Sequence, residues 1–127
     1  MNERERAAGL AETPGYRYAD RVGGELFVAG QVPRDADGQL VGAGDAAAQT
    51  EQCLRNLATL LAVHSLDRSH VRHLRVYVAG EHEQLLAAWS VVTRWFDDDV
   101  PPATLVGIAV LGYKGQLVEI EPTVVAG

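Results

Sequence analysis

The stretch that decides the fold is Val100–Val125, which reads VPPATLVGIAVLGYKGQLVEIEPTVV. Two apolar runs rich in β-branched residues, Thr104–Leu111 and Leu117–Val125, flank a short Gly-Tyr-Lys-Gly-Gln connection. Both runs are too short for ordinary helices, so we predict two strands that pair through this glycine-containing loop. This part of the chain is therefore expected to form a β-hairpin within a sheet.

One residue interrupts the apolar character of the second run. Glu119 stands between Val118 and Ile120, and in a strand Glu119 and Glu121 point to the face opposite those two neighbours. A carboxylate in the middle of a sheet indicates either a face exposed to solvent or a functional site. The residues alone leave both interpretations open and favour the solvated face.

The composition is that of one ordinary globular domain. The chain has 127 residues, of which 47% are hydrophobic and 22% are charged. Its net charge of −6 and its scattered basic residues argue against nucleic-acid binding, which needs clustered lysine and arginine. The single cysteine, Cys53, cannot form an internal disulfide and is expected to be an inert buried thiol. No segment resembles a signal peptide or a membrane span, so we expect a cytoplasmic protein without membrane contacts.

The chain is predicted to be a mobile N-terminal arm, residues 1–15, followed by one α+β domain, residues 16–127. Alternating and helical apolar patterns follow one another in the order βββαβαββ. The predicted strands are Tyr16–Val22, Glu25–Gln31, Gln39–Val41, Val71–Ala79, Thr104–Leu111 and Leu117–Val125, and the predicted helices are Ala46–His64 and Glu81–Phe96. Two helices on one face of a mixed sheet is the simplest packing of these elements.

The opposite face of the predicted sheet also carries apolar side chains. Both alternating sets along Thr104–Leu111 contain them, so a monomer would expose an apolar patch to water. Association of several copies buries such a face. We therefore expect a homo-oligomer, in which a site at Glu119 lies between subunits.

Six short motifs are spread from Tyr16 to the C-terminal region. They are Gly15-Tyr16, Leu26–Pro33, Gln49-Thr50 with Leu54-x-Asn56-Leu57, Val76-Tyr77-Val78, Pro101-Pro102-Ala103 and Val118–Glu121. In this order they resemble the YjgF/RidA family. The resemblance implies a chorismate-mutase-like fold and a homotrimer that binds small molecules in clefts between subunits. It also implies hydrolysis of reactive enamines and imines to a carbonyl product and ammonia, without a metal or an organic cofactor.

The resemblance assigns roles to two residues. Glu119 matches the family's cleft glutamate, which positions or activates the attacking water, and it becomes the candidate catalytic residue. Tyr16 matches the cleft tyrosine that contacts the ligand. A tyrosine that only caps the edge of the sheet is the alternative for Tyr16.

Three candidate substrate-binding positions depart from the active deaminases. Thr104 stands where those enzymes have the arginine that binds the substrate carboxylate, and a hydroxyl brings no charge. Ala29 replaces a serine, and Trp89 replaces an asparagine near the cleft. The resemblance therefore implies a more apolar cleft, with a substrate other than the small 2-imino acids.

Another cation could replace the missing arginine. Arg75 is a candidate substrate-binding residue because its strand face could line the subunit interface, and Lys114 is a second candidate. The alternatives are an interface salt bridge for Arg75 and a solvated loop for Lys114. His70 and His73 would point to opposite faces of a strand and so do not form a metal site together.

Three functions remain open at this point. The first is a RidA-like hydrolase of enamines or imines. The second is a non-catalytic small-metabolite-binding or pathway accessory protein on the same trimeric scaffold. The third, a ribonuclease, is disfavoured because the chain is acidic and has no histidines paired for RNA cleavage.

Overall fold

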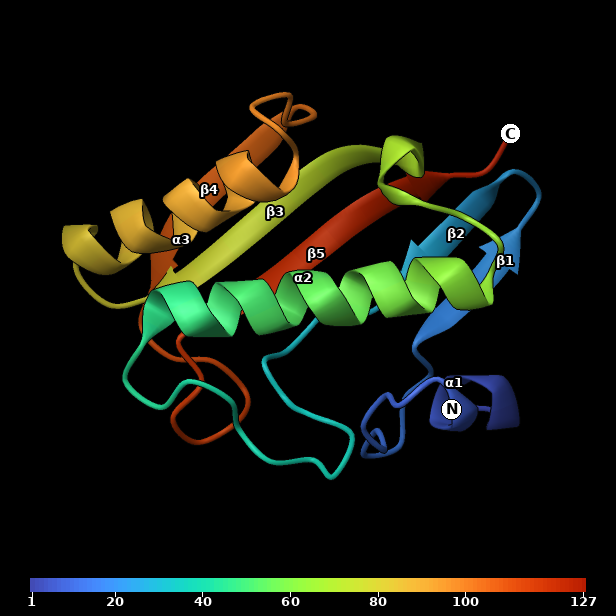
Figure 1. Cartoon of the computed structure of the whole chain (residues 1–127), viewed down its shortest axis with the longest axis horizontal. Helices are drawn as coiled ribbons and strands as arrows, with labels where there is room; N and C mark the ends of the chain where they lie inside the picture. The colour runs from blue at the N-terminus through green and yellow to red at the C-terminus, as the bar shows by residue number, and fades with distance from the viewer.

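The computed structural model describes all residues from Met1 to Gly127 as a five-stranded sheet with helices packed on it (Figure 1). The elements are α1 (Glu3–Ala7), β1 (Ala19–Val22), β2 (Glu25–Val28), α2 (Ala46–Val63), a 3-10 helix (Arg68–His70), β3 (Val71–Ala79), α3 (His82–Trp95), β4 (Ala103–Ile108) and β5 (Val118–Val125). The strand order is β1-β2-β5-β3-β4, and only β3 and β4 are parallel. The predicted α+β class and mixed sheet are confirmed.

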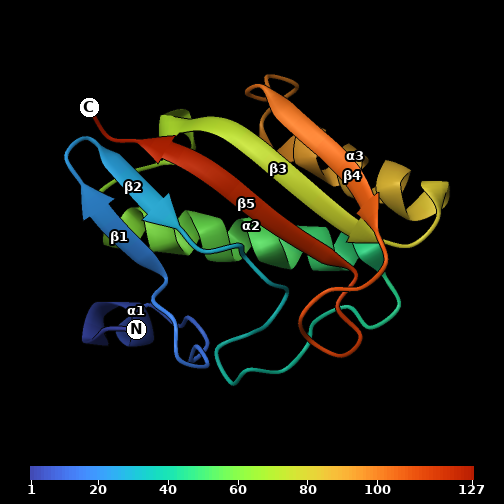
Figure 2. The same cartoon turned by 180° about the vertical axis from the view of Figure 1, so that it is seen from behind.

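Helices α2 and α3 cover the same face of the sheet, as predicted (Figures 1 and 2). Helix α2 begins after Asp45, whose side chain accepts a hydrogen bond from the Ala48 amide at 3.0 Å. Its inner stripe is fully buried and consists of Cys53, Leu54, Leu57, Leu60 and Leu61. Burial raises the pKa of the Cys53 thiol, in agreement with an inert cysteine. No helix combines the length and the apolar character needed to cross a membrane.

The other face of the sheet is not covered by helices, and Figure 2 views the molecule from this side. We call it the open face. Along β5, Val118, Ile120 and Val124 are buried toward the helices, whereas Glu119 and Glu121 are only partly buried on the open face. The predicted alternation of this strand is therefore confirmed.

The predicted hairpin between the last two strands is wrong. Strand β3 lies between β4 and β5, and β4 pairs with β3 from Leu74↔Ala103 to Ala79↔Ile108. Helix α3 provides the crossover that a parallel pair requires, so β4 runs beside β3 in the same direction. The chain then passes from β4 to β5 around the end of β3 (Figure 2).

One other sequence prediction needs correction. Gln39–Val41 is not a strand, because only an isolated bridge joins Arg34 and Leu40 around a tight turn.

Residues 1–15, for which the sequence predicts a mobile arm, contain the short helix α1 and a loop that contacts the domain. Leu10 and Ala11 are each 4% exposed, and the Tyr18 hydroxyl donates to the Ala11 carbonyl at 2.6 Å. Burial of these two side chains holds the segment against the end of α2.

Candidate functional site

Glu119 lies near the start of β5, on the open face and opposite Tyr77 of β3. Its Oε1 accepts a hydrogen bond from Nε2 of Gln116 at 3.1 Å. Gln116 is 4% exposed; it also donates to the Val118 carbonyl at 3.0 Å and accepts from the Tyr113 amide at 3.1 Å. These three bonds fix the Gln116 amide, which therefore orients the Glu119 carboxylate.

The backbone of Gly30 lies directly against the Glu119 carboxylate. A β-carbon added at Gly30 would lie within 2.8 Å of Cδ of Glu119 and closer still to Oε2. The next residue, Gln31, exchanges backbone hydrogen bonds with Ile120 at 2.7 and 3.1 Å, which attaches this segment to β5. Glycine at position 30 therefore leaves the space that the carboxylate occupies.

Tyr16 and Ala29 line one open hollow of about 480 Å³ beside β1 and β2. Ala29 directly precedes Gly30, whose backbone lies against the Glu119 carboxylate. Partial burial, and then the nearby Tyr113 phenol, raise the pKa of Tyr16. Tyr16 is therefore a neutral hydroxyl at physiological pH, able to donate a hydrogen bond to a ligand. The structure brings these two predicted residues to the side of the sheet where Glu119 lies.

Arg75 lies on the open face, but its guanidinium already forms hydrogen bonds with other side chains of the same chain. Its Nε donates to Oε1 of Glu121 at 2.8 Å, and its Nη2 donates to Oγ1 of Thr123 at 3.2 Å. Its Nη1 lies 2.8 Å from Nδ1 of His73, and Tyr77 donates to the same Glu121 oxygen at 3.0 Å. The salt bridge considered for Arg75 is thus formed within one chain.

The Arg75–Glu121 pair gives a pH dependence of stability. The hydrogen bond from Arg75, and a weaker one from Tyr77, lower the pKa of Glu121 below its usual 4.5. Because the folded-state pKa is depressed, the stabilisation is present above about pH 4.5 and is lost as the pH falls through the lower value. The two side chains are 33% and 40% exposed, so we expect at most about 1 kcal/mol.

The measurement is the melting temperature of the wild type and of Glu121→Gln between pH 3 and pH 7. The wild type should melt higher at pH 7, and the difference should shrink below pH 4.5. A difference that grew on acidification would contradict the assignment of the lowered pKa to this ion pair.

The remaining predicted residues do not meet Glu119 within one chain. Thr104 is exposed on β4 and lies opposite Arg75 of β3. Strand β3 lies between β4 and β5, so Thr104 is two strand spacings, of about 4.8 Å each, from the strand that carries Glu119. Trp89 belongs to α3 and packs against the core on the covered face of the sheet. Lys114 is exposed in the loop that precedes β5. These placements separate Thr104 and Trp89 from the carboxylate.

Several residues around Glu119 carry only a weak sequence signal. Gly30 interrupts a strand pattern, which is a known sign of close approach by another group. Gln116 and Tyr113 lie in the loop before β5, and nothing in their spacing predicts that Gln116 contacts Glu119. The contact between Glu119 and Gly30 joins distant parts of the chain, so local patterns do not reveal it.

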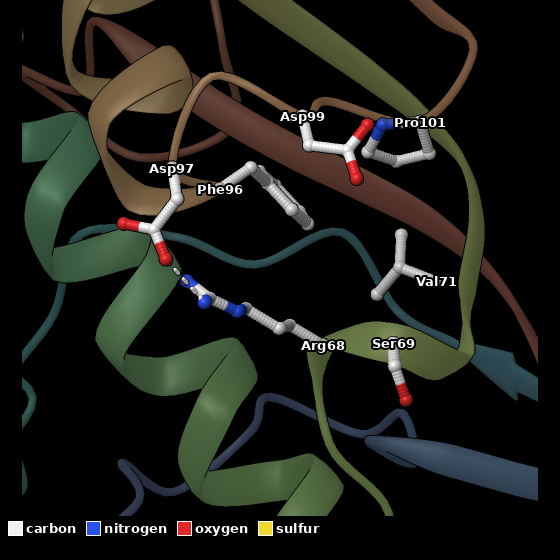
Figure 3. Close-up of a pocket in the computed structure, with 7 residues that line it drawn as sticks. All are labelled: Arg68, Ser69, Val71, Phe96, Asp97, Asp99 and Pro101. Carbon is white, nitrogen blue, oxygen red and sulfur yellow. Dashed lines mark hydrogen bonds and ion pairs between the residues drawn. The ribbon is translucent and has the colours of Figure 1, made fainter.

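A second, larger hollow of about 560 Å³ lies between the end of α3 and the start of β3 (Figure 3). Arg68 pairs there with Asp97 at 2.6 Å, so the two opposite charges neutralise each other. The hollow is lined by Arg68, Ser69, Val71, Phe96, Asp97, Asp99 and Pro101. Val71 pairs with Val124 near the end of β5, whereas Glu119 lies near its start. This hollow is therefore separate from the Glu119 site.

Comparison with known proteins gives consistent matches over most of the chain. The family model described as Endoribonuclease L-PSP matches residues 8–126. Protein DfrA of Myxococcus xanthus is 30% identical over 107 residues, which cover 83% of this chain and 79% of the relative. The structure of a candidate endoribonuclease from Thermotoga maritima has a TM-score of 0.80 and 30% identity, covering 90% of this chain and 88% of that one. YyfA of Yersinia pestis, from the Rid protein family, has a TM-score of 0.81 and 25% identity, with coverages of 91% and 90%.

Proposed function

Because the chain belongs to the Endoribonuclease L-PSP family, which is the YjgF/RidA family, we propose that it hydrolyses reactive enamine or imine intermediates to a carbonyl product and ammonia. The observation that carries the proposal is the position of the Glu119 carboxylate. It is held between the Gln116 amide and the Gly30 backbone, beside the hollow lined by Tyr16 and Ala29. A fixed, partly exposed carboxylate can take a proton from water.

In this mechanism Glu119 accepts a proton from a water molecule as the water oxygen attacks the C=N carbon. Glu119 returns that proton to the nitrogen, which gives the neutral carbinolamine. It then takes the proton of the carbinolamine hydroxyl and passes it to the same nitrogen as the C–N bond breaks, which releases ammonia and leaves a carbonyl group. An enamine first takes a proton on carbon to become the imine. The Tyr16 hydroxyl donates a hydrogen bond that orients the substrate. The sum is imine plus water giving carbonyl plus ammonia, so no external reductant or oxidant is required.

The proposed substrate differs from the small 2-imino acids. Thr104 brings no positive charge to the position at which the family's deaminases bind a carboxylate, and Ala29 brings no hydroxyl. Both substitutions favour a substrate with a larger apolar part. Trp89 and Arg75 stay candidates for the cleft of the assembled protein.

We also propose that the protein is a homotrimer with three clefts between subunits. The open face carries exposed apolar side chains, among them Val22 (59% exposed) and Phe27 (55% exposed). A neighbouring subunit on this face would cover them and could bring its own Thr104 toward Glu119. Analytical ultracentrifugation at micromolar concentration should give three times the chain mass. A monomer at all concentrations would contradict the assembly.

The proposed activity is tested with imines made in place by an L-amino-acid oxidase. Semicarbazide traps the free imine, so a hydrolase should reduce semicarbazone formation and accelerate ammonia release. With leucine or phenylalanine as the oxidase substrate we expect at least a tenfold acceleration over buffer. No acceleration with any amino acid, together with ligand-induced thermal stabilisation, would instead support a non-catalytic binding protein.

A further inference from the structure

Helix α2 carries a buried polar side chain, that of Gln49, which bonds to loops on both sides of the helix in the sequence. Gln49 is completely buried. Its Nε2 donates to the Gly42 carbonyl and to the Gly115 carbonyl, each at 3.1 Å. Its Oε1 accepts a hydrogen bond from the Leu117 amide at 2.7 Å. Gln49 therefore joins the start of α2 to the loop that precedes β5.

The backbone of Gln116 is held in place from both sides within that loop. Gln49 bonds to the residue before Gln116 and to the residue after it. The Gln116 amide itself donates to the Tyr113 carbonyl at 3.0 Å, which closes a tight turn. The Leu117 carbonyl accepts from the Ala79 amide at 2.8 Å, which attaches the end of the loop to β3. These bonds leave the Gln116 backbone one position.

The side chain of Gln116 continues this series of bonds to Glu119. Its Nε2 donates to Oε1 of Glu119 at 3.1 Å and to the Val118 carbonyl at 3.0 Å, so both of its N–H groups are used. Its Oε1 accepts from the Tyr113 amide at 3.1 Å. The amide group cannot turn without losing one of these bonds. The series therefore runs from Gln49 through Gln116 to the Glu119 carboxylate.

Gln49 and Glu119 belong to opposite sides of the sheet. Helix α2, which carries Gln49, covers one face, whereas Glu119 lies on the open face (Figures 1 and 2). Gln49 is fully buried and so does not contact a ligand beside Glu119. Any effect of Gln49 on the reaction must therefore pass through the loop and the Gln116 side chain.

We propose that Gln49 is a positioning residue for Glu119. Its bonds hold the Gln116 backbone, and thereby the Gln116 amide, in the place from which the Glu119 carboxylate is aimed at the attacking water. The inference rests on the proposed hydrolysis at Glu119. Because a displacement of about 1 Å in a catalytic group can cost 100-fold in rate, loss of the Gln49 bonds should lower kcat. KM should stay nearly constant, since Gln49 makes no contact with the ligand.

The test is a measurement of kcat and KM for oxidase-generated imine in Gln49→Met. Methionine is similar in length and fills the buried site without forming the hydrogen bonds. We expect kcat to fall about tenfold or more and KM to change by less than about twofold.

Thr50→Val is the matched control for this variant. Thr50 is the next residue on α2, is equally buried, and donates a hydrogen bond to the Ala46 carbonyl within the helix. Its replacement removes a buried hydrogen bond that has no connection to the loop before β5. Both variants should melt at a lower temperature than the wild type, but Thr50→Val should keep kcat within about twofold. An equal loss of kcat in Thr50→Val, or a change in Gln49→Met confined to KM, would overturn the proposal.

Gln116→Leu is a second variant, in case the loss of three buried hydrogen bonds keeps Gln49→Met from folding. It leaves every bond of Gln49 in place and removes only the last step to Glu119. It should lose about as much kcat as Gln49→Met, and the two changes together should cost little more than either one. Full kcat in Gln116→Leu would overturn the proposal, because Gln49 would then have no route to Glu119. Fold-losses that multiply in the double variant would overturn it as well.

Crystal structures of the two variants give a readout that does not depend on turnover. The Glu119 carboxylate should be displaced from its wild-type position while α2 and β5 keep theirs. A carboxylate that has not moved would overturn the positioning role even if the wild type hydrolyses imines. A wild type without imine turnover would instead overturn the proposed hydrolase, and the same structures would still decide whether Gln49 fixes the Glu119 side chain.

Discussion

Replacing Glu119 with glutamine should lower kcat/KM for imine hydrolysis at least 100-fold. Glutamine has nearly the same shape, and its carbonyl oxygen can still accept the hydrogen bond from Gln116. It cannot take a proton from water, and general-base catalysis contributes about 10²- to 10⁴-fold to such reactions. The rate of ammonia release from oxidase-generated imine measures the loss. Circular dichroism and thermal unfolding should match the wild type.

Glu121→Gln is the matched control for this variant. Glu121 is on the same strand and the same face, two residues further along, and its carboxylate is engaged by Arg75 and Tyr77. We expect its activity to stay within threefold of the wild type. If Glu121→Gln lost as much activity as Glu119→Gln, the loss would come from the changed charge of the open face and not from the removal of Glu119 as the general base. Full activity in Glu119→Gln would remove the catalytic role of Glu119.

Gly30→Ala should lower kcat about tenfold to 100-fold, although it adds a single methyl group. The new β-carbon would overlap the Glu119 carboxylate, which must then move away from Gly30. A displacement of about 1 Å in a catalytic group can cost 100-fold in rate. The same ammonia assay measures the effect. A crystal structure of the variant should show the Glu119 side chain shifted while β2 and β5 stay paired.

Gly112→Ala provides the comparison, because a β-carbon at Gly112 meets nothing within 4 Å. It should leave kcat unchanged, which separates the loss of space at Gly30 from a general effect of replacing a glycine. In the Glu119→Gln background, Gly30→Ala should cost little more, since both changes act on one group. If the fold-losses in kcat of the two single variants multiplied in the double variant, Gly30 would act through a group other than Glu119.

The sequence predicted the elements whose patterns are local. Strand β5 alternates residue by residue, so the placement of Glu119 and Glu121 on one face followed from the spacing alone. Helix α2 was predicted to within one residue at its C-terminal end because Asp45 and the leucine stripe mark its limits. In both cases the interactions that form the element lie within the element.

The errors concern pairing and packing between distant segments. β4 and β5 follow each other in the chain, but β3 lies between them, and no local pattern distinguishes this order from a hairpin. The contacts of the N-terminal segment also lie outside local patterns, because they depend on the Tyr18 hydroxyl and on the burial of Leu10. For the site, the resemblance to a family indicated Glu119 and Tyr16. The contacts Gly30–Glu119 and Gln116–Glu119 came only from the folded chain.

A crystal structure of the protein with bound 4-methyl-2-oxopentanoate tests directly whether Glu119 lies in the cleft that binds the ligand. The carbonyl carbon should lie beside Glu119, with a water molecule held by the carboxylate about 3–3.5 Å from that carbon. Tyr16 should contact the same ligand, and a neighbouring subunit should close the cleft. A ligand bound in the hollow of Arg68 and Asp97 (Figure 3), with Glu119 facing open solvent, would contradict catalysis by Glu119.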